Sequence, residues 1–376
     1  MNLRILKIIV LTTFTWTHLA FSLEEPIRNY RSARSLGMGG VLVTTANDGE
    51  TLFGNSARLA DVAQPKLTLF EVFGEGNEQF ITYSKDYNDI YNNTGTGILR
   101  RANTLGGKNY HLRVQNLTSF VHPNLIGDFA FGIGVLAMTH TNLLVEYTSD
   151  FSGQFITDLG PVFSIAHPFF SKTLLLGLSV KTLYRLGFDE TISAGTLLSN
   201  NKTISTKDFG RQGVGIDVDI GLYYKVPIDF IRPIRFDVGA NFRNLVKSHY
   251  SELSINQVYT TTNKPPSNDR VIDAGIRLNF ADSWILYDTL IALEMQNIGN
   301  NTKRMSRMKR VHIGFESRLR KLLGFRCGLH QGYLAGGVML FVPHVKIQLG
   351  TYSEELGSVA GAYEDRRYVG SVSLEI

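Results

Sequence analysis

The last eleven residues of the chain, Arg366 to Ile376, constrain its fold more than any other stretch. From Tyr368 to Ile376 every second residue is apolar or glycine, and most residues between them are polar or charged. This alternation predicts a β-strand with one apolar face. No later residue of the sequence can cover that face, so we expect lipid to cover it, as it covers the strands of an outer-membrane β-barrel.

Residues 1–22 are typical of a secretory signal peptide. Arg4 and Lys7 form its positive end, residues 8–21 form an apolar segment, and Ala20-Phe21-Ser22 fits a cleavage site. An uncleaved anchor is the alternative. After residue 22 no apolar run approaches the roughly 20 residues of a spanning helix, so later membrane segments are expected to be strands.

Bulk composition excludes several classes of protein. Charged residues make up 19% of the chain and the formal net charge is +5, which indicates neither a disordered chain nor a nucleic-acid partner. Cys327 is the only cysteine, so the chain can form no internal disulfide and no thiolate metal cluster. The 36 glycines and the 11% of aromatic residues suit the tight turns and interfacial aromatic rings of a membrane barrel.

Period-two patterns predict about fourteen strands, and the connections between them alternate between short and long. This rhythm is typical of an all-β, antiparallel transmembrane barrel with short periplasmic turns, longer outer loops and both termini in the periplasm. Twelve or sixteen strands, and a water-soluble β-protein, are the alternatives. The expected strands are 66–73, 110–121, 128–139, 154–166, 173–185, 213–225, 235–247, 270–280, 286–297, 310–318, 324–331, 334–342, 344–353 and 366–376.

The middle strands separate apolar from charged side chains most clearly, and we expect their charged face to line the lumen. Carboxylates gathered there need nearby cations, since otherwise their pKa values rise. A lattice of salt bridges is the favoured interpretation, and a cation site or a catalytic dyad is the alternative. The expected lumen residues are Asp217, Asp219, Arg235, Asp237, Asp273 and Arg277, with Arg243 and Arg326 as further cations.

Residues 23–65 come before the first expected strand, do not alternate and are too long for a simple leader. We expect them to form a plug inside the lumen, with a periplasmic extension as the alternative. The chain would then consist of a signal peptide (1–22), a plug (23–65) and a barrel (66–376).

Two motifs in this plug segment carry a family resemblance. They are Gly37-Met38-Gly39-Gly40 and Asn55-Ser56-Ala57-Arg58-Leu59-Ala60, with Asp48 between them. The segment resembles the N-terminal plug of the FadL/TodX-type outer-membrane transporters, whose relatives include the PorV-like proteins. The resemblance implies a 14-stranded barrel with a lumen plug. It covers the plug, the first strand and, more loosely, the last third of the chain.

The resemblance also implies roles for single residues. Gly37, Gly39 and Gly40 match the family's glycine turn, Asp48 its acidic step, and Asn55 and Ala57 the turn into the first strand. Ser56 stands where the family has proline, whose ring fixes φ. Taken without the resemblance, the glycines could also form a phosphate cradle, but no strand precedes them and no Lys-Ser/Thr follows.

Catalytic and metal motifs are not found in the sequence, so we expect no enzyme, no cofactor and no metal. Patterns such as G-x-S-x-G, H-E-x-x-H and C-x-x-C are missing. An inward-facing set could bind a metal only if several strands brought its members together. That set is His312, Glu316, His330 and His344.

Two expected outer loops carry features that suit a ligand or a surface. In loop 74–109, Phe80, Tyr83, Tyr87 and Ile90 are spaced as on an amphipathic helix, and they are our tentative ligand-binding residues. A loop packed on its own rim is the alternative. Residues 303–310 are strongly basic, which suits a solvated loop, contact with lipopolysaccharide or attraction of anionic amphiphiles.

The sequence therefore predicts a multi-pass barrel in the outer membrane for passive transport of hydrophobic or amphipathic small molecules, such as long-chain fatty acids. The alternative is a PorV-like scaffold for protein secretion or surface attachment, whose partner would be a secreted protein. An open porin is disfavoured by the expected plug. Further expected partners are outer-membrane lipid, lipopolysaccharide and the barrel-assembly machinery, which would recognise the C-terminal strand.

Overall fold

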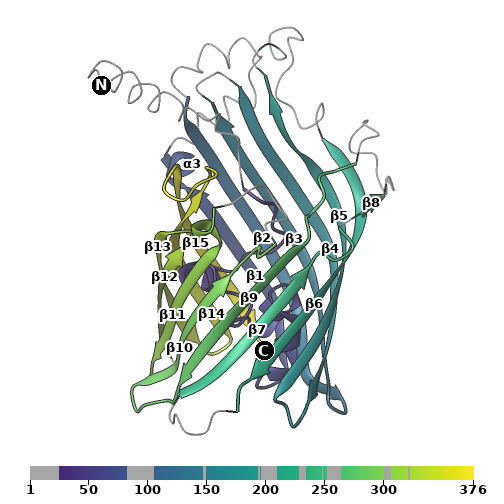
Figure 1. Cartoon of the computed structure of the whole chain (residues 1–376), viewed down its shortest axis with the longest axis vertical. Coiled ribbons are helices and arrows are strands. Elements are labelled where there is room, and N and C mark those ends of the chain that lie inside the picture. The colour runs from purple at the N-terminus through teal and green to yellow at the C-terminus, as the bar shows by residue number, and fades with distance from the viewer. Residues whose placement is uncertain are drawn as a thin grey trace, which may run out of the picture.

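The computed structural model describes residues 25–82, 106–146, 150–193, 195, 210–227, 234–247, 249–251, 264–299, 306–320 and 322–376. The expected signal peptide lies outside the described residues. The described strands form one closed antiparallel barrel with a segment of chain inside it (Figure 1). Fourteen strands close the barrel, and the additional three-residue strand β8 (His249–Ser251) pairs with β6 above the end of β7, so the predicted count is confirmed.

Consecutive strands are hydrogen-bonded neighbours, and β15 pairs with β1 to close the barrel. The strands are β1 (Lys66–Asn77), β2 (Lys108–Ile126), β3 (Phe129–Val145), β4 (Phe151–Phe169), β5 (Leu174–Ile192), β6 (Arg211–Lys225), β7 (Ile234–Arg243), β9 (Val271–Phe280), β10 (Leu286–Met295), β11 (Val311–Leu319), β12 (Leu323–His330), β13 (Tyr333–Val342), β14 (Val345–Glu355) and β15 (Glu364–Glu375).

The barrel wall has the face distribution of a protein in lipid. Outward side chains are apolar and exposed, such as Val72 at 48%, Ile216 at 54% and Leu349 at 57%, while many buried side chains are polar or charged. A water-soluble β-protein shows the reverse, so that alternative is wrong. The fold and the apolar outer face are those of an outer-membrane β-barrel.

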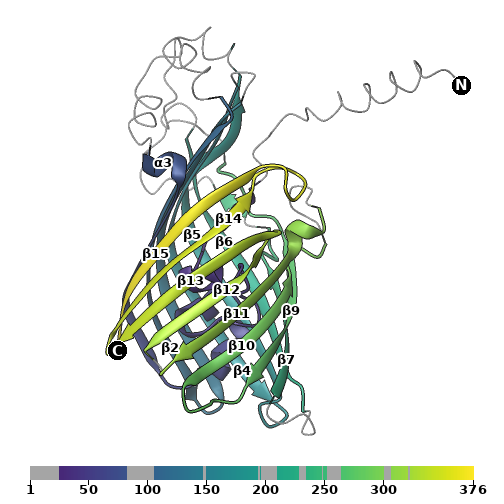
Figure 2. The same cartoon turned by 90° about the vertical axis from the view of Figure 1, so that its left-hand side faces the viewer.

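Short turns and long connections lie at opposite ends of the barrel (Figure 2). Several short turns use residues with positive φ, including Gly127 at 60°, Lys172 at 68° and His344 at 67°. The C-terminus lies at the short-turn end, and the short helix α3 (Glu78–Thr82) lies at the other end. The short-turn end is therefore the periplasmic end.

The plug consists of α2 (Ala33–Gly37) and two 3-10 helices, η1 (Asp48–Leu52) and η2 (Ser56–Asp61), all inside the barrel (Figure 1). Each helix begins at a polar N-cap. The side chains of Ser32 and Asn55 accept hydrogen bonds from Ser35 and Ala57 backbone N–H groups, and Asn47 forms a capping box with Glu50. These caps start three short helices in a segment that lacks the periodicity of a long one. Among the described residues, no helix is long and apolar enough to cross a membrane.

Candidate functional site

The turn that leads from the plug into the barrel is fixed to the wall by Asn55, which is fully buried. Its Nδ2 donates to the backbone carbonyls of Val43 (3.0 Å), Leu222 (3.1 Å) and Ala240 (3.4 Å). Its Oδ1 accepts from the Ala57 N–H at 3.1 Å. One side chain therefore joins two parts of the plug to strands β6 and β7.

Glycines in the wall make room for this turn. Gly177 on β5 and Gly221 on β6 are cross-strand partners. A Cβ built on Gly177 would lie 2.3 Å from the Ala57 nitrogen, and one built on Gly221 would lie 2.2 Å from Asn55 Oδ1. Only glycine lets the plug backbone lie this close to the wall.

The glycine turn of the plug contacts the opposite side of the barrel. Gly39 has φ +71°, and a Cβ on it would lie 2.4 Å from the Ile313 carbonyl oxygen on β11. The Nδ1 atoms of His312 and His330 lie 2.8 Å and 3.1 Å from the Gly39 carbonyl oxygen. A Cβ on Gly40 would lie 2.4 Å from His330 Nδ1, and one on Gly37 would lie 3.3 Å from Gly337. The three glycines thus sit where side chains would separate plug from wall.

The remaining plug residues that the sequence singled out are Asp48, Ala57 and Ser56. Asp48 has φ 49° and forms a 2.8 Å ion pair with Lys66 at the start of β1. Ala57 is fully buried. Ser56 is 3% exposed, and its hydroxyl has no hydrogen-bond partner among the described residues.

Buried ion pairs hold the N-terminal part of the plug against strands β1, β14 and β15. Arg31 pairs with Glu25 (2.6 Å), Glu75 (3.4 Å) and Glu354 (3.2 Å), and Arg367 of β15 pairs with Glu25 at 2.7 Å. Burial would raise the pKa of the Glu25 carboxyl, but the guanidiniums of Arg367 and Arg31 hold it well below its usual range. Removing one member of such a buried set typically costs about 3–5 kcal/mol.

A second charged cluster surrounds Arg34 of α2. Arg34 pairs with Glu50 of the plug at 3.1 Å and with Glu316 of β11 at 2.5 Å, and Arg326 also contacts Glu316 at 3.0 Å. Burial alone would lower the pKa of Arg34, but Glu316 and Glu50 raise it above its ordinary value. An ion pair therefore links the plug to strand β11, and the sequence of the plug alone does not predict this contact.

The expected lumen carboxylates are buried on the inner face, each with its own partners. Asp219 binds Lys181 at 2.8 Å, Asp273 binds Arg243 at 2.5 Å, and Asp237 accepts from Tyr223 at 2.7 Å. Asp217 is 4% exposed and accepts from the Val218 N–H at 2.8 Å.

The expected cations are more widely distributed. Arg235 reaches Asp237 at 3.3 Å from a side chain that is 51% exposed, and Arg277 donates to the Thr44 carbonyl of the plug at 3.2 Å. Arg326 forms an ion pair with Glu316, which is not one of the expected aspartates. Lys181 was not among the residues predicted from the sequence. It lies on the buried face of β5, and the alternation of buried and less buried residues along that strand could have identified it.

The four residues considered for a metal do not come together. His312 and His330 have ring centroids 4.8 Å apart, but Glu316 is bound by Arg34 and Arg326. His344 is exposed in a short turn and contacts the Glu375 carbonyl at 3.1 Å.

Of the tentative ligand-binding residues, Phe80 lies in α3 at the outer end of the barrel. Tyr83, Tyr87 and Ile90 lie outside the described residues, as do residues 303–305 of the basic segment. An open pocket of about 450 Å³ beside α3 is lined by polar residues such as Asn77, Glu78 and Asp365, and Phe80 is not among its lining residues.

Two polar cavities lie on opposite sides of the plug. The outer one, of about 90 Å³, is lined by Arg28, Arg243 and Lys309 among others, and the periplasmic one, of about 180 Å³, by Asp48 and Lys346 among others. Ligand pockets commonly measure about 300–1,000 Å³. Both cavities are smaller than this, so neither holds a ligand of that size while the plug is in the position described.

Part of the inner wall of β2, β3 and β4 is apolar, although the same strands also carry buried polar and charged side chains such as Arg113, Ser119 and Asp158. Plug residues pack against the apolar part and exclude water from a continuous cluster. The buried members are Tyr30, Leu52, Phe53, Leu59, Val62, Leu117, Val121, Ala130, Leu136, Met138, Ile156, Val162 and Ala166. A water-filled pore has no need of such a surface, since porin interiors are polar.

No protein-family model matches this sequence, and no curated protein matches it. The solved structures that share the fold include two monoaromatic hydrocarbon channels. The deltaS2 mutant of the monoaromatic hydrocarbon channel TodX aligns with a TM-score of 0.52 at 12% identity, over 94% of this chain and 98% of that one. The monoaromatic hydrocarbon channel CymD aligns with a TM-score of 0.50 at 13% identity, over 91% of this chain and 96% of that one. The fold is the FadL/TodX-type barrel that the plug motifs indicated.

Proposed function

We propose that this barrel carries a hydrophobic or amphipathic small molecule passively across the outer membrane, with long-chain fatty acids as one substrate class. The observation that carries the proposal is the apolar part of the inner wall of β2–β4, which the plug covers. If the plug shifts, that part of the wall becomes a surface on which an apolar molecule can bind.

The arrangement of the plug supports this proposal. Its apolar residues, including Leu52 and Leu59, face β2–β4, while Arg31 and Arg34 face buried carboxylates. Two solved structures that share the fold are described as hydrocarbon channels. We further propose that Phe80, with Tyr83, Tyr87 and Ile90 of the same loop, receives the ligand on the outer side.

Uptake measurements test the proposal. Cells that produce the barrel should take up a radiolabelled long-chain fatty acid or toluene faster than cells without it. Asn55→Ala removes all four hydrogen bonds of that side chain, so it should impair uptake while the barrel still shows heat-dependent migration in gels. Gly74→Ala is the matched control, because a Cβ on Gly74 meets nothing within 4 Å. Equal uptake with and without the barrel contradicts the function.

A protein scaffold is the second candidate, and the tight seating of the plug favours it. Arg31, Glu25 and Arg367 form a buried ionic cluster that a freely opening channel would have to break. A scaffold would co-purify with a stable protein partner and would leave fatty-acid and toluene uptake unchanged. Affinity purification from native outer membranes, combined with the uptake assay, separates the two functions.

A further inference from the structure

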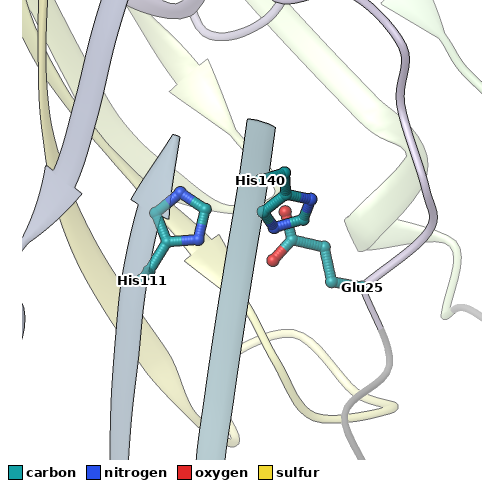
Figure 3. Close-up of side chains that lie close together, drawn as sticks. All are labelled: Glu25, His111 and His140. Carbon is teal, nitrogen blue, oxygen red and sulfur yellow. The ribbon is translucent and has the colours of Figure 1, made fainter. Parts of the chain in front are cut away.

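Three buried side chains from separate parts of the chain meet inside the barrel, near its outer end. Glu25 comes from the plug, His111 from β2 and His140 from β3 (Figure 3). Their exposed fractions are 1%, 0% and 1%. One potential ligand atom from each lies within 4.8 Å of the other two, and the imidazole centroids are 5.1 Å apart.

Both imidazole rings have nitrogen atoms that form no hydrogen bond among the described residues. Nδ1 and Nε2 of His140 and Nδ1 of His111 are buried and have no hydrogen-bond partner among the described residues. Each such buried polar atom costs about 1–3 kcal/mol, and native proteins leave few of them. Three such atoms at one point provide the polar groups that a bound ligand needs.

The surrounding hydrogen bonds prepare this group for a cation. His111 Nε2 lies 2.7 Å from the Glu75 carboxylate, which fixes the proton on Nε2 and leaves the lone pair on Nδ1. A carboxylate behind a histidine is the usual support of a metal-binding imidazole. Glu25 is held in position by Asn142 at 2.7 Å and by Arg31 at 2.6 Å.

We propose that Glu25, His111 and His140 bind one divalent transition-metal ion, with Zn²⁺ as the best match to two imidazoles and a carboxylate. Ligand atoms around a tetrahedral zinc ion are about 3.4 Å apart, so the three side chains tighten around the ion from their present spacing. Imidazole ligands favour zinc, copper or nickel over magnesium or calcium. The ion competes with the guanidiniums of Arg31 and Arg367 for the Glu25 carboxylate.

The ion would join the plug to two wall strands at once. Glu25 precedes the first helix of the plug. His111 and His140 belong to the paired strands β2 and β3, in which Arg113 is the cross-strand partner of His140. Metal binding therefore adds a bond between plug and wall that a chelator can remove. The proposal does not depend on what the barrel transports.

Metal binding by the full-length barrel in detergent tests the proposal. After chelator treatment and dialysis against Zn²⁺, elemental analysis should find one ion per chain. His140→Ala should weaken binding by more than the roughly 10- to 100-fold that loss of a supporting residue costs. The side chain of His140 makes no hydrogen bond among the described residues, so this change should leave folding intact.

His312→Ala is the matched control, because His312 belongs to the other buried histidine pair, with centroids 4.8 Å apart. It should leave zinc binding unchanged. Absence of bound zinc in the unmodified protein, unchanged binding in His140→Ala or loss of binding in His312→Ala overturns the proposal. If His140→Ala does not fold, the electron paramagnetic resonance spectrum of Cu²⁺ bound to the unmodified protein provides the test. It should show coupling to two nitrogen atoms, and the absence of that coupling counts against the site.

Discussion

The side-chain amide of Asn55 donates a hydrogen bond to the carbonyl oxygen of Leu222, and this contact links the last turn of the plug to strand β6 of the wall. The two residues are 167 positions apart in the sequence. The same amide reaches Val43 within the plug, so Asn55 couples the internal fold of the plug to its position in the barrel.

Asn55→Asp should loosen the plug without removing its cap. The substitution keeps an acceptor for the Ala57 N–H, but it loses the donor to Leu222 and Ala240 and places a negative charge beside carbonyl oxygens. We expect a cost of about 1–3 kcal/mol for the buried groups left unpaired. Hydrogen exchange across residues 55–61 should accelerate, and unchanged exchange would contradict the role of the amide.

Gly177→Ala should displace the plug while the barrel still assembles. The new Cβ would lie 2.3 Å from the Ala57 nitrogen and the Ser56 carbonyl carbon, which are backbone atoms that cannot rotate away. Overpacking of this kind costs about 1–3 kcal/mol. Limited proteolysis of the plug should become faster than in Gly74→Ala, whose Cβ meets nothing within 4 Å. Equal proteolysis of the two variants would count against close packing at Gly177.

Ser56→Pro should be tolerated and should stabilise the plug. Asn55 is extended, with φ −159° and ψ 105°, as a residue before proline must be, and Ser56 is the first residue of η2, where proline fits well. The change also removes a buried hydroxyl that has no partner among the described residues. We expect a gain of about 0.4–1 kcal/mol in urea titrations. Ser56→Ala separates the effect of the hydroxyl from that of the ring, and a loss of stability in the proline variant contradicts this account.

Glu355→Gln should loosen the connection between β14 and β15. The Glu355 carboxylate accepts from the backbone N–H groups of Gly357, Gly361, Ala362 and Tyr363 at 2.7–2.9 Å, and from the Tyr333 hydroxyl at 2.7 Å. An amide has only one oxygen for these donors, and a bond to a charged group is worth about 1.5–3 kcal/mol. Hydrogen exchange of 356–363 should increase. Asp128→Asn, in an exposed turn at the other end, should show no such change.

Acidification should release the end of the plug through Asp61. This carboxylate pairs with Lys225 and, at 3.3 Å, with Arg58. Burial would raise the pKa of Asp61, but these cations lower it below its ordinary value of about 3.9. Its stabilising contribution is therefore complete above about pH 4 and is lost as the pH falls through the lower folded-state pKa. The difference in stability between the unmodified protein and Asp61→Asn should be constant from pH 8 to 5 and should shrink below about pH 4. A difference that stays constant down to pH 2 would contradict the assignment.

Alternation in the sequence was sufficient to predict most of the barrel, because a strand with lipid on one side and a polar lumen on the other must alternate. Asp217 and Asp219 could be placed on the inner face for that reason alone. The third strand shows where the signal ends. It was expected to finish at residue 139, but it continues to Val145, and all six residues from His140 to Val145 are buried. A strand covered on both faces has no reason to alternate.

The contacts of the plug could not be predicted in the same way. Glu25 and Arg367 are 342 positions apart and meet only because the barrel closes around the plug. Their pairing depends on strand register and on the depth of the plug, which local patterns do not encode. His111, Arg113 and Gln115 alternate with apolar residues, so their inward direction was readable from the sequence, but their proximity to Glu25 was not.

The pairing of β1 with β15 has a consequence for how the protein is made. The plug runs directly into β1, and β1 finds its second neighbour only in β15, near the end of the chain. The barrel therefore cannot close around the plug until β15 pairs with β1. Until Arg367 arrives, the charges of Glu25 and Glu75 lack one of their partners. The same strand, β15, therefore both closes the wall and supplies the cation that pairs with Glu25 and Glu75.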